Sequence, residues 1–267
     1  MHQAIKKLTA TLNNQKVFYY HPFNSQLFLN NFIGKEIKIS WNLSCTCTGC
    51  GLSQKKLQQG YCFKCSRNLA ACDLCILKPE LCHFHLGTCR EPNWGLEHCM
   101  KEHVIYLAMT SQLKIGITRR DQLPTRWIDQ GAYWAIPLAI TFSRLHAGLL
   151  EIEIAKSIAD KTDWRDLLRG FKEIISKSPL EIALEIQKKI ITYSSELKIP
   201  TEIIELKVQE LEYPVLKYCE KAQTVSLEKN NEIEDTLIGI RGQYLLLEKN
   251  GGFNVRKYSG YHLKIEN

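Results

Sequence analysis

Cysteine is concentrated in one part of the chain. The sequence contains 11 cysteines, and ten of them lie between Cys45 and Cys99. Cysteines at this density form either a disulfide framework or a metal site. Disulfide frameworks are typical of small secreted domains, and residues 1–14 lack the long apolar stretch and small-residue cleavage site of a secretory signal. Close Cys-x-x-Cys pairs with interspersed histidines instead favour zinc, and therefore a reducing, cytoplasmic compartment.

The clearest metal-binding pattern is a pair of Cys-x-x-Cys units. Cys47 and Cys50 form the first unit, and Cys62 and Cys65 follow after eleven intervening residues. Four thiolates at this spacing can bind one zinc ion tetrahedrally. Because such an ion has no open position for water or substrate, we expect this zinc to be structural.

A second group of ligand types follows and offers more donors than one zinc ion needs. Cys72 and Cys75 form a third Cys-x-x-Cys unit, and Cys99 and His103 have the spacing of another ligand pair. The sequence does not pair these ligands, but it predicts at least one further structural zinc, and so one to three zinc ions in all. The candidates are Cys72, Cys75, Cys82, His83, Cys89, Cys99 and His103.

Four residues that could act on a phosphodiester follow the cysteines. Tyr106 ends the run Val104-Ile105-Tyr106, and Lys114 begins Lys114-Ile115-Gly116 eight residues later. Arg126 comes ten residues after Gly116, and Glu151 begins a later helical pattern. In order and spacing these residues resemble the GIY-YIG nuclease superfamily, in its variant with Lys-Ile-Gly as the second motif. The resemblance covers about residues 104–160.

This resemblance implies a nuclease site that depends on Mg²⁺ or Mn²⁺. Glu151 would hold the divalent cation, Arg126 would clamp phosphate, and Tyr106 would orient or deprotonate the water. Gly116 would let its strand pass close to the phosphate, and Lys114 would place a cation where many relatives carry a tyrosine. Each residue also has an ordinary structural interpretation, such as a core tyrosine, a glycine bulge and a solvated glutamate.

Further polar residues lie close to these motifs in the sequence. They could bind substrate, although Trp127, Asp129 and Arg165 could equally form a buried structural network. The substrate-binding candidates are Arg119, Asp129, Gln130 and Arg144, with Asp160 and Arg165 as additional members of a polar site.

Several longer motifs extend over most of the chain. They are Gln59-Gly-Tyr-Cys62, Lys78-Pro-Glu-Leu-Cys82-His83, Gly87-Thr-Cys89-Arg-Glu-Pro92, Lys114-Ile-Gly-Ile-Thr-Arg119, Arg126-Trp-Ile-Asp-Gln-Gly-Ala132, Asp160-Lys-Thr-Asp-Trp164-Arg165 and Ile240-Arg-Gly-Gln-Tyr244. Together they look like a bacterial family called domain of unknown function 2797. This resemblance is more specific than the one to the nuclease superfamily, but it implies no established activity.

The sequence patterns predict an α+β fold in four segments, and the elements of these segments must position the residues named above. Residues 1–44 and 200–267 carry short β-like runs, which we expect to form a small barrel together, with a hairpin at Asn250-Gly251. Residues 45–103 form the zinc-binding segment, and residues 104–199 a GIY-YIG-like α/β core. In that core we expect strands over 103–109 and 113–118 and helices over 145–159, 164–175 and 180–191. A strand is also predicted over 203–208 and another over 26–32.

Composition narrows the function without deciding it. The net charge is +7, and there is no run of about 18 uncharged apolar residues, so no membrane span is expected. A mild basic excess fits polyanion binding, although each four-thiolate zinc would cancel about two charges. We therefore predict a zinc-containing protein that acts on DNA or RNA, with endonuclease cleavage as the leading hypothesis. The alternatives are a non-catalytic nucleic-acid binder and a zinc-stabilised interaction protein, and the sequence does not fix the oligomeric state.

Overall fold

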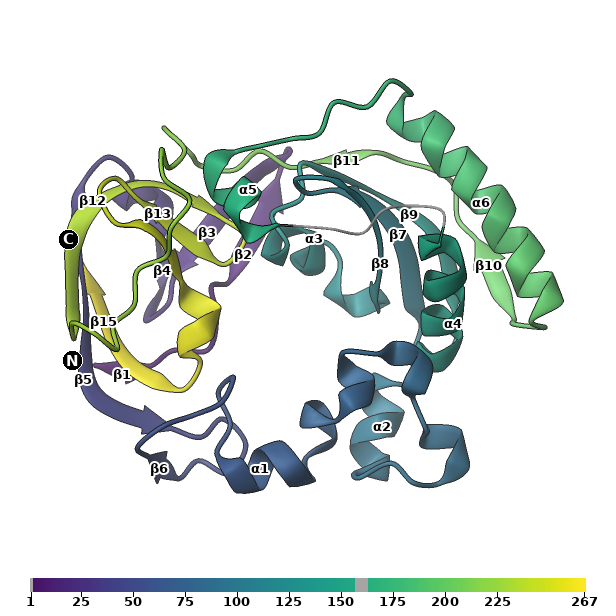
Figure 1. Cartoon of the computed structure of the whole chain (residues 1–267), viewed down its shortest axis with the longest axis horizontal. Coiled ribbons are helices and arrows are strands. Elements are labelled where there is room, and N and C mark those ends of the chain that lie inside the picture. Colours follow the sequence, from purple (N-terminus) through teal and green to yellow (C-terminus); the bar gives the residue numbers. More distant parts are fainter. Residues whose placement is uncertain (1, 157–162) are drawn as a thin grey trace.

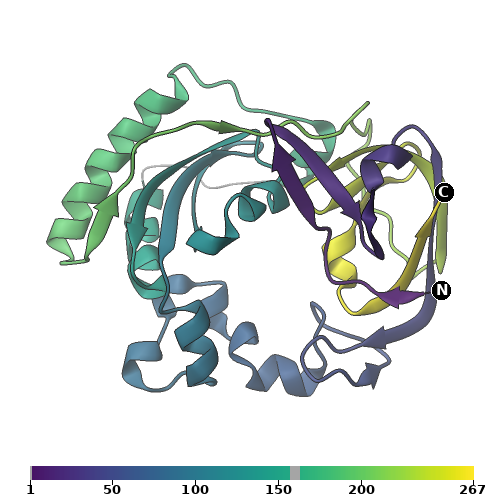
Figure 2. The same ribbon diagram turned by 180° about the vertical axis from the view of Figure 1, so that it is seen from behind.

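The chain folds into two lobes that are joined by the cysteine-rich region. The computed structural model describes residues 2–156 and 163–267. The β lobe comprises residues 2–46 and 211–267 and holds both termini, the α/β lobe comprises residues 103–156 and 163–210, and the cysteine segment, residues 47–102, runs between them (Figure 1 and, from behind, Figure 2).

Strands from both ends of the chain share one antiparallel sheet in the β lobe. Its burial alternates as the sequence pattern predicts, with Ile37 and Ile39 buried and Lys38 and Ser40 partly exposed. The hairpin predicted at Asn250-Gly251 joins the strands β13 and β14. The order of strands is β1 (Gln3–Ala4), β15 (Tyr261–Glu266), β5 (Glu36–Thr46), β12 (Glu232–Arg241), β13 (Tyr244–Leu247) and β14 (Gly251–Asn254), and β6 (Ser53–Gln54) pairs with the end of β5.

The expected small barrel is wrong, because this sheet stays open. Its outer strands β1 and β14 are two and four residues long, and no pairing joins them within the described ranges 2–156 and 163–267. The other N-terminal strands form a separate sheet, in the order β2 (Ala10–Asn13), β3 (Lys16–His21) and β4 (Asn24–Phe28). The strand predicted over 26–32 turns into the 3-10 helix η1 (Leu29–Phe32), and a second such helix, η7 (Val255–Tyr258), follows β14.

The α/β lobe is built on an antiparallel sheet in which a central strand carries the tyrosine motif and the neighbouring edge strand carries the glycine motif. The strand order is β10 (Thr201–Ile203), β9 (Trp134–Thr141), β7 (His103–Met109) and β8 (Leu113–Arg119), and β11 (Gln209–Glu210) also pairs with β9. Residues 201–210 therefore belong to this sheet, and the strand predicted over 203–208 is confined to its first residue.

Helices cover one face of that sheet. Ile105, Leu107 and Met109 on β7 pack there with Leu150 of α4 (Arg144–Ala155) and Ile186 of α6 (Pro179–Glu196). The predicted start of α6 is confirmed, since Ser178 and Glu181 form a capping box with Pro179 at the first helical position. The helix predicted over 164–175 is shorter, because α5 (Trp164–Arg169) ends at Gly170 in the left-handed conformation.

The opposite face of the sheet turns toward the β lobe. Tyr106 and Ala108 lie on this face, with Trp127 and Ile128 of the short helix α3 (Thr125–Asp129), which follows the 3-10 helix η6 (Arg120–Gln122). These side chains share one hydrophobic core with β-lobe residues such as Leu245. The two lobes are therefore packed together and not merely connected.

The cysteine segment consists of short helices and turns that dock on α4. A Cβ atom on Gly148 of α4 would lie 2.5 Å from the backbone nitrogen of Glu80, so glycine allows the close approach. No described helix has both the length and the apolar character needed to cross a membrane. The elements are α1 (Phe63–Asn68), η2 (Ala70–Cys72), η3 (Leu74–Ile76), η4 (Pro79–Leu81), η5 (Phe84–Leu86) and α2 (Pro92–His98).

Candidate functional site

The two predicted Cys-x-x-Cys units meet in one four-thiol cluster. The sulfur atoms of Cys47, Cys50, Cys62 and Cys65 all lie within 4.8 Å of one another, and those of Cys50 and Cys62 are 4.0 Å apart. Tetrahedral zinc with Zn–S bonds of about 2.3 Å requires sulfur atoms roughly 3.8 Å apart. The cluster therefore fits zinc in size and in ligand type.

The local backbone prepares this cluster for a cation. The amide of Cys62 donates to the sulfur of Cys47 (3.2 Å), and the amide of Cys65 points at the sulfur of Cys62 (3.5 Å). Burial disfavours the thiolate of Cys47, but backbone N–H groups of Cys50, Cys62 and Gly49 outweigh it and lower its pKa to about 6. A Cβ atom at Gly49 would lie 2.6 Å from Cδ1 of Leu69 and 3.2 Å from the sulfur of Cys65, so glycine leaves room for both side chains. With four protein ligands the centre is closed, as a structural zinc site is.

The later cysteines do not all lie around one centre. Cys75, Cys82 and Cys99 are buried together and line one small cavity with His83 and Cys89. The thiol of Cys99 bonds the sulfur of Cys82 and lowers the pKa of Cys82 to about 6. Within the described residues, the lining includes neither Cys72 nor His103. The third Cys-x-x-Cys unit, Cys72 with Cys75, is therefore not brought together around this cavity.

His103 lies on β7, fully buried and apart from this cavity lining. Its Nδ1 bonds the carbonyl oxygen of Lys101 (2.8 Å), and burial lowers the pKa of its imidazole to about 4, so the ring is neutral. The structure therefore does not place His103 in the lining of this cavity, and its buried Nε2 has no hydrogen-bond partner among the described residues.

The tyrosine and glycine of the two motifs lie directly opposite each other. Tyr106 on β7 pairs with Gly116 on β8, and Lys114 pairs with Ala108, so the three predicted residues share one face of the sheet. The phenol of Tyr106 is fully buried and donates a hydrogen bond of 2.7 Å to Oε1 of Gln130. Gln130 is thus the partner of Tyr106, a role that its position just after α3 makes possible.

Arg126 and Glu151 also act on that phenol. Burial raises the pKa of Tyr106, Arg126 opposes the rise by charge and by a hydrogen bond, and the carboxylate of Glu151 adds to it. Residues from β7, α3 and α4 are therefore close enough to influence one hydroxyl. Because the phenol remains protonated at neutral pH, it holds Gln130 and Arg126 in place and is poorly suited to remove a proton from water.

The remaining substrate-binding candidates have structural partners. Asp129 bonds Lys7 (2.7 Å) and Gln243 (2.8 Å), which ties α3 to the β lobe. Arg144 donates to the carbonyl oxygens of Cys75 (3.3 Å) and Ile76 (2.6 Å), which ties the cysteine segment to α4. Arg119 pairs with Asp121 across 3.1 Å near the surface.

The two additional members of the predicted polar site do not extend it. The guanidinium of Arg165 lies over the ring of Trp164 at 4.6 Å, and its side chain is 53% exposed, so it is no part of a buried network. Asp160 lies outside the described residues.

Sequence reasoning missed Arg241, the largest fully buried side chain among the described residues. Its guanidinium lies 3.9 Å from the ring centre of Tyr133 and bonds the carbonyl oxygens of Gly131 and Thr110. Arg241 stood in one of the longer motifs, Ile240-Arg-Gly-Gln-Tyr244, which was the signal available, but a lone arginine in a β pattern gives no sign of its partners.

Replacing Gly116 with alanine is expected to disturb the phenol directly. The added Cβ would lie 2.6 Å from the hydroxyl oxygen of Tyr106, so the ring must move and the bond to Gln130 must lengthen. We expect a loss of about 1–3 kcal/mol in the free energy of unfolding. The variant Tyr106→Phe keeps the ring carbon Cζ, 2.7 Å from the new Cβ, but has already lost the bond to Gln130. Because both changes affect that one bond, the combined cost in a double-mutant cycle should be less than the sum. Strictly additive costs, measured by urea unfolding, would contradict the contact.

The fold and the site together define an α+β protein in which a segment with a four-thiol cluster that could hold a metal ion connects a β lobe to an α/β lobe. The chain belongs to the family described as Protein of unknown function (DUF2797), whose model matches residues 34–263. The family resemblance of the longer motifs is thereby confirmed. No curated protein and no solved structure matches the chain.

Proposed function

We propose that this protein acts on nucleic acid and that its α/β lobe carries a GIY-YIG-like site for cleaving phosphodiesters. The observation that carries the proposal is the convergence of Tyr106, Gly116, Arg126 and Glu151, which come from β7, β8, α3 and α4, around one phenol. The strand order β8-β7-β9 supports it as well, because both motifs lie on adjacent antiparallel strands.

Each residue of the proposed site can be given a role in phosphodiester cleavage. Arg126 offers planar N–H donors to a phosphate, and Lys114 adds a second cation on the same face of the sheet. Glu151 supplies a carboxylate for Mg²⁺ or Mn²⁺, which commonly binds one or two carboxylates and completes its shell with water and phosphate oxygens. When bound, such an ion lowers the pKa of water and stabilises charge on the phosphate. Tyr106 positions Arg126 and Gln130.

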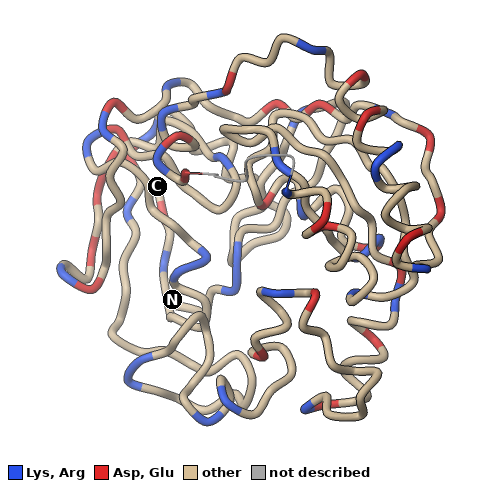
Figure 3. The backbone as a smooth tube through the Cα atoms, turned by 45° about the vertical axis from the view of Figure 1, so that its right-hand side comes forward, with Lys and Arg blue, Asp and Glu red and all other residues tan. Residues whose placement is uncertain are grey.

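The surface around the four-thiol cluster supports contact with a polyanion. No acidic residue occurs from Ile37 to Cys72, whereas Lys55, Lys56, Lys64 and Arg67 are exposed there. Figure 3 shows several Lys and Arg positions at the lower left of the molecule. Phe63 is 74% exposed in the same region, with the guanidinium of Arg67 over its ring, and exposed aromatic rings stack on unpaired bases. The zinc itself would be structural.

The variants Arg126→Ala and Glu151→Gln test the cleavage site. We expect each to slow cleavage by about 10²–10³-fold, because each removes a charge that acts on the transition state. Purified protein would be incubated with Mg²⁺ or Mn²⁺ and single- or double-stranded DNA or RNA. Glu153→Gln is the matched control, since Glu153 lies on the same helix but pairs with Lys156.

The outcomes separate the three functional classes. If the unmodified protein leaves all four substrates intact under both metals, the proposed cleavage is wrong. Binding that weakens with salt, without cleavage, would select the non-catalytic nucleic-acid binder. Absence of any salt-sensitive binding would select the zinc-stabilised interaction protein and overturn the nucleic-acid proposal altogether.

A further inference from the structure

We propose that the cysteine segment holds a second metal centre, with Cys75, Cys82, Cys99 and His83 as its ligands and zinc as its ion. The three thiols are buried together against Phe84, Trp94 and Leu145. They line one small cavity, and the side chain of His83 lines it as well. This donor set, three thiolates and one imidazole, is a common one for structural zinc.

The burial pattern of the surrounding residues is the reverse of that of an ordinary core. Leucines point to solvent while the cysteines point inward, so burial of apolar side chains contributes little to holding these turns together. The ligands come from η3, the end of η4 and the end of α2, and bonds to a shared ion would join these three elements directly. The exposed residues are Leu74, Leu77, Leu81, Leu86 and Leu96, of which Leu77 is 75% exposed.

The hydrogen bonds of His83 leave its Nε2 atom available to a cation. Thr88 donates its hydroxyl proton to the carbonyl oxygen of His83 (3.3 Å), so its oxygen accepts the N–H of Nδ1 at 2.7 Å. Nε2 then carries a lone pair, yet it lies 3.7 Å from a carboxylate oxygen of Asp73, and a ring nitrogen of His83 lies within 4.8 Å of the sulfur of Cys75. A positive ion among these electron-rich atoms removes the repulsion, and a partner on the second ring nitrogen is typical of metal-bound histidine.

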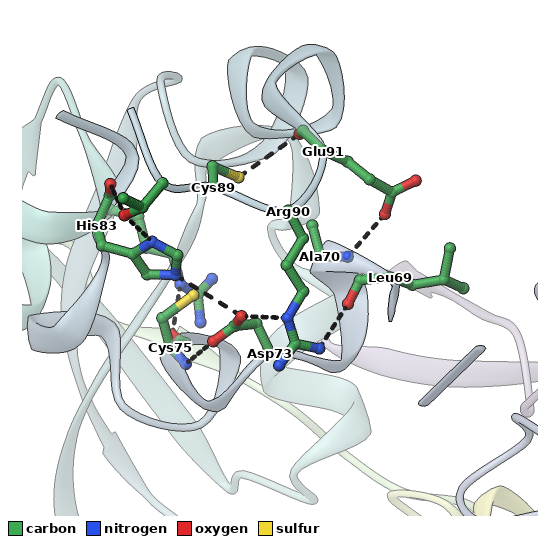
Figure 4. Close-up of polar contacts among 10 residues, drawn as sticks. Leu69, Ala70, Asp73, Cys75, His83, Cys89, Arg90 and Glu91 are labelled. Carbon is green, nitrogen blue, oxygen red and sulfur yellow. Dashed lines mark hydrogen bonds and ion pairs between the residues drawn. The ribbon is translucent and has the colours of Figure 1, made fainter. Parts of the chain in front are cut away.

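Figure 4 shows why the neighbouring donors are assigned to the surroundings of the centre. The sulfur of Cys89 is directed toward the carbonyl oxygen of Glu91, at 3.5 Å. Asp73 bonds the guanidinium of Arg90 (2.7 Å) and accepts the amide of Cys75 (3.2 Å), so both of its oxygens already have partners. Both residues therefore support the ligands without binding the ion.

The charges around the cavity suit this ion. Three thiolates, a neutral imidazole and Zn²⁺ carry a net charge of about −1. The guanidinium of Arg144 is bonded to the carbonyl oxygens of Cys75 and Ile76, next to the sulfur atoms. Arg144 would thus balance the centre and connect it to the first turn of α4 in the α/β lobe.

Native mass spectrometry of the full chain gives the first test, because it needs no variant. We expect two zinc ions per chain, one in the four-thiol cluster and one here. One ion per chain in protein expressed with ample zinc would overturn the proposal. This result is independent of any nuclease or nucleic-acid assay.

Variants then test the ligand set. Cys82→Ser, Cys99→Ser and His83→Ala should each reduce the zinc content from two to one, whereas Cys89→Ser should keep two. The double variant Cys47→Ser/Cys62→Ser should also hold one ion, now in the second centre. Retention of both ions in His83→Ala together with loss of one in Cys89→Ser would overturn the assignment of His83. Circular dichroism on each variant checks that the remaining structure is folded.

Discussion

Replacing Cys62 with serine is expected to remove one zinc ion and to lower the melting temperature by roughly 8–16 °C. Structural zinc contributes an apparent binding free energy of about 10–16 kcal/mol in small zinc modules. Loss of one of four ligands would forfeit a part of this, about 4 kcal/mol, and each kcal/mol corresponds to roughly 2–4 °C for a chain of this size. Zinc content and thermal unfolding, measured on the same sample, check the result.

The large effect follows from the position of Cys62. Its thiol caps the N-terminus of α1, its own amide donates to the sulfur of Cys47, and its sulfur lies 4.0 Å from that of Cys50. A serine keeps the cap but loses the thiolate that zinc requires. Cys72→Ser is the matched control, since Cys72 belongs to neither ligand set and should retain the zinc. Unchanged zinc content in Cys62→Ser would show that the four-thiol cluster does not bind it.

Local patterns in the sequence predicted the elements that carry the motifs. The strands β7 and β8 follow from two apolar runs joined by the polar turn Thr110-Ser111-Gln112, and the start of α6 follows from Ser178-Pro179. The strand β9 was missed because Pro137 interrupts Trp134–Thr141, and a proline argues against a strand inside a sheet. The barrel was wrong because closure depends on pairing between distant strands, which turn signals do not specify.

For the candidate site, too, the sequence predicted the groups that are close along the chain and did not predict the contacts between distant residues. Spacing alone predicted the four-thiol cluster, because its ligands lie within two tight turns that are close in sequence. Asp129 was assigned to substrate, yet its partners Lys7 and Gln243 are 122 and 114 residues away. No local pattern reveals such contacts. For the same reason the sequence could name the donors of the proposed second metal centre but could not separate Cys75 from Cys72.

Arg241→Met is expected to lower the free energy of unfolding by roughly 2–6 kcal/mol. The guanidinium bonds the carbonyl oxygen of Gly131 twice, at 3.1 and 2.8 Å, and that of Thr110 at 3.1 Å. Methionine fills much of the aliphatic volume but leaves both carbonyl groups without these donors, at about 1–3 kcal/mol each. Urea unfolding measures the loss.

The effect should extend beyond one strand, because Arg241 lies at the end of β12 in the β lobe while its partners lie in the α/β lobe. Lysine is not expected to rescue the variant, since an ammonium cannot present a planar set of donors to both carbonyls and stack on Tyr133. Arg256→Met is the matched control, because Arg256 is exposed and its replacement should change stability by no more than about 0.5 kcal/mol. Equal stability of the two methionine variants would mean that the buried guanidinium makes no net contribution to holding the lobes together.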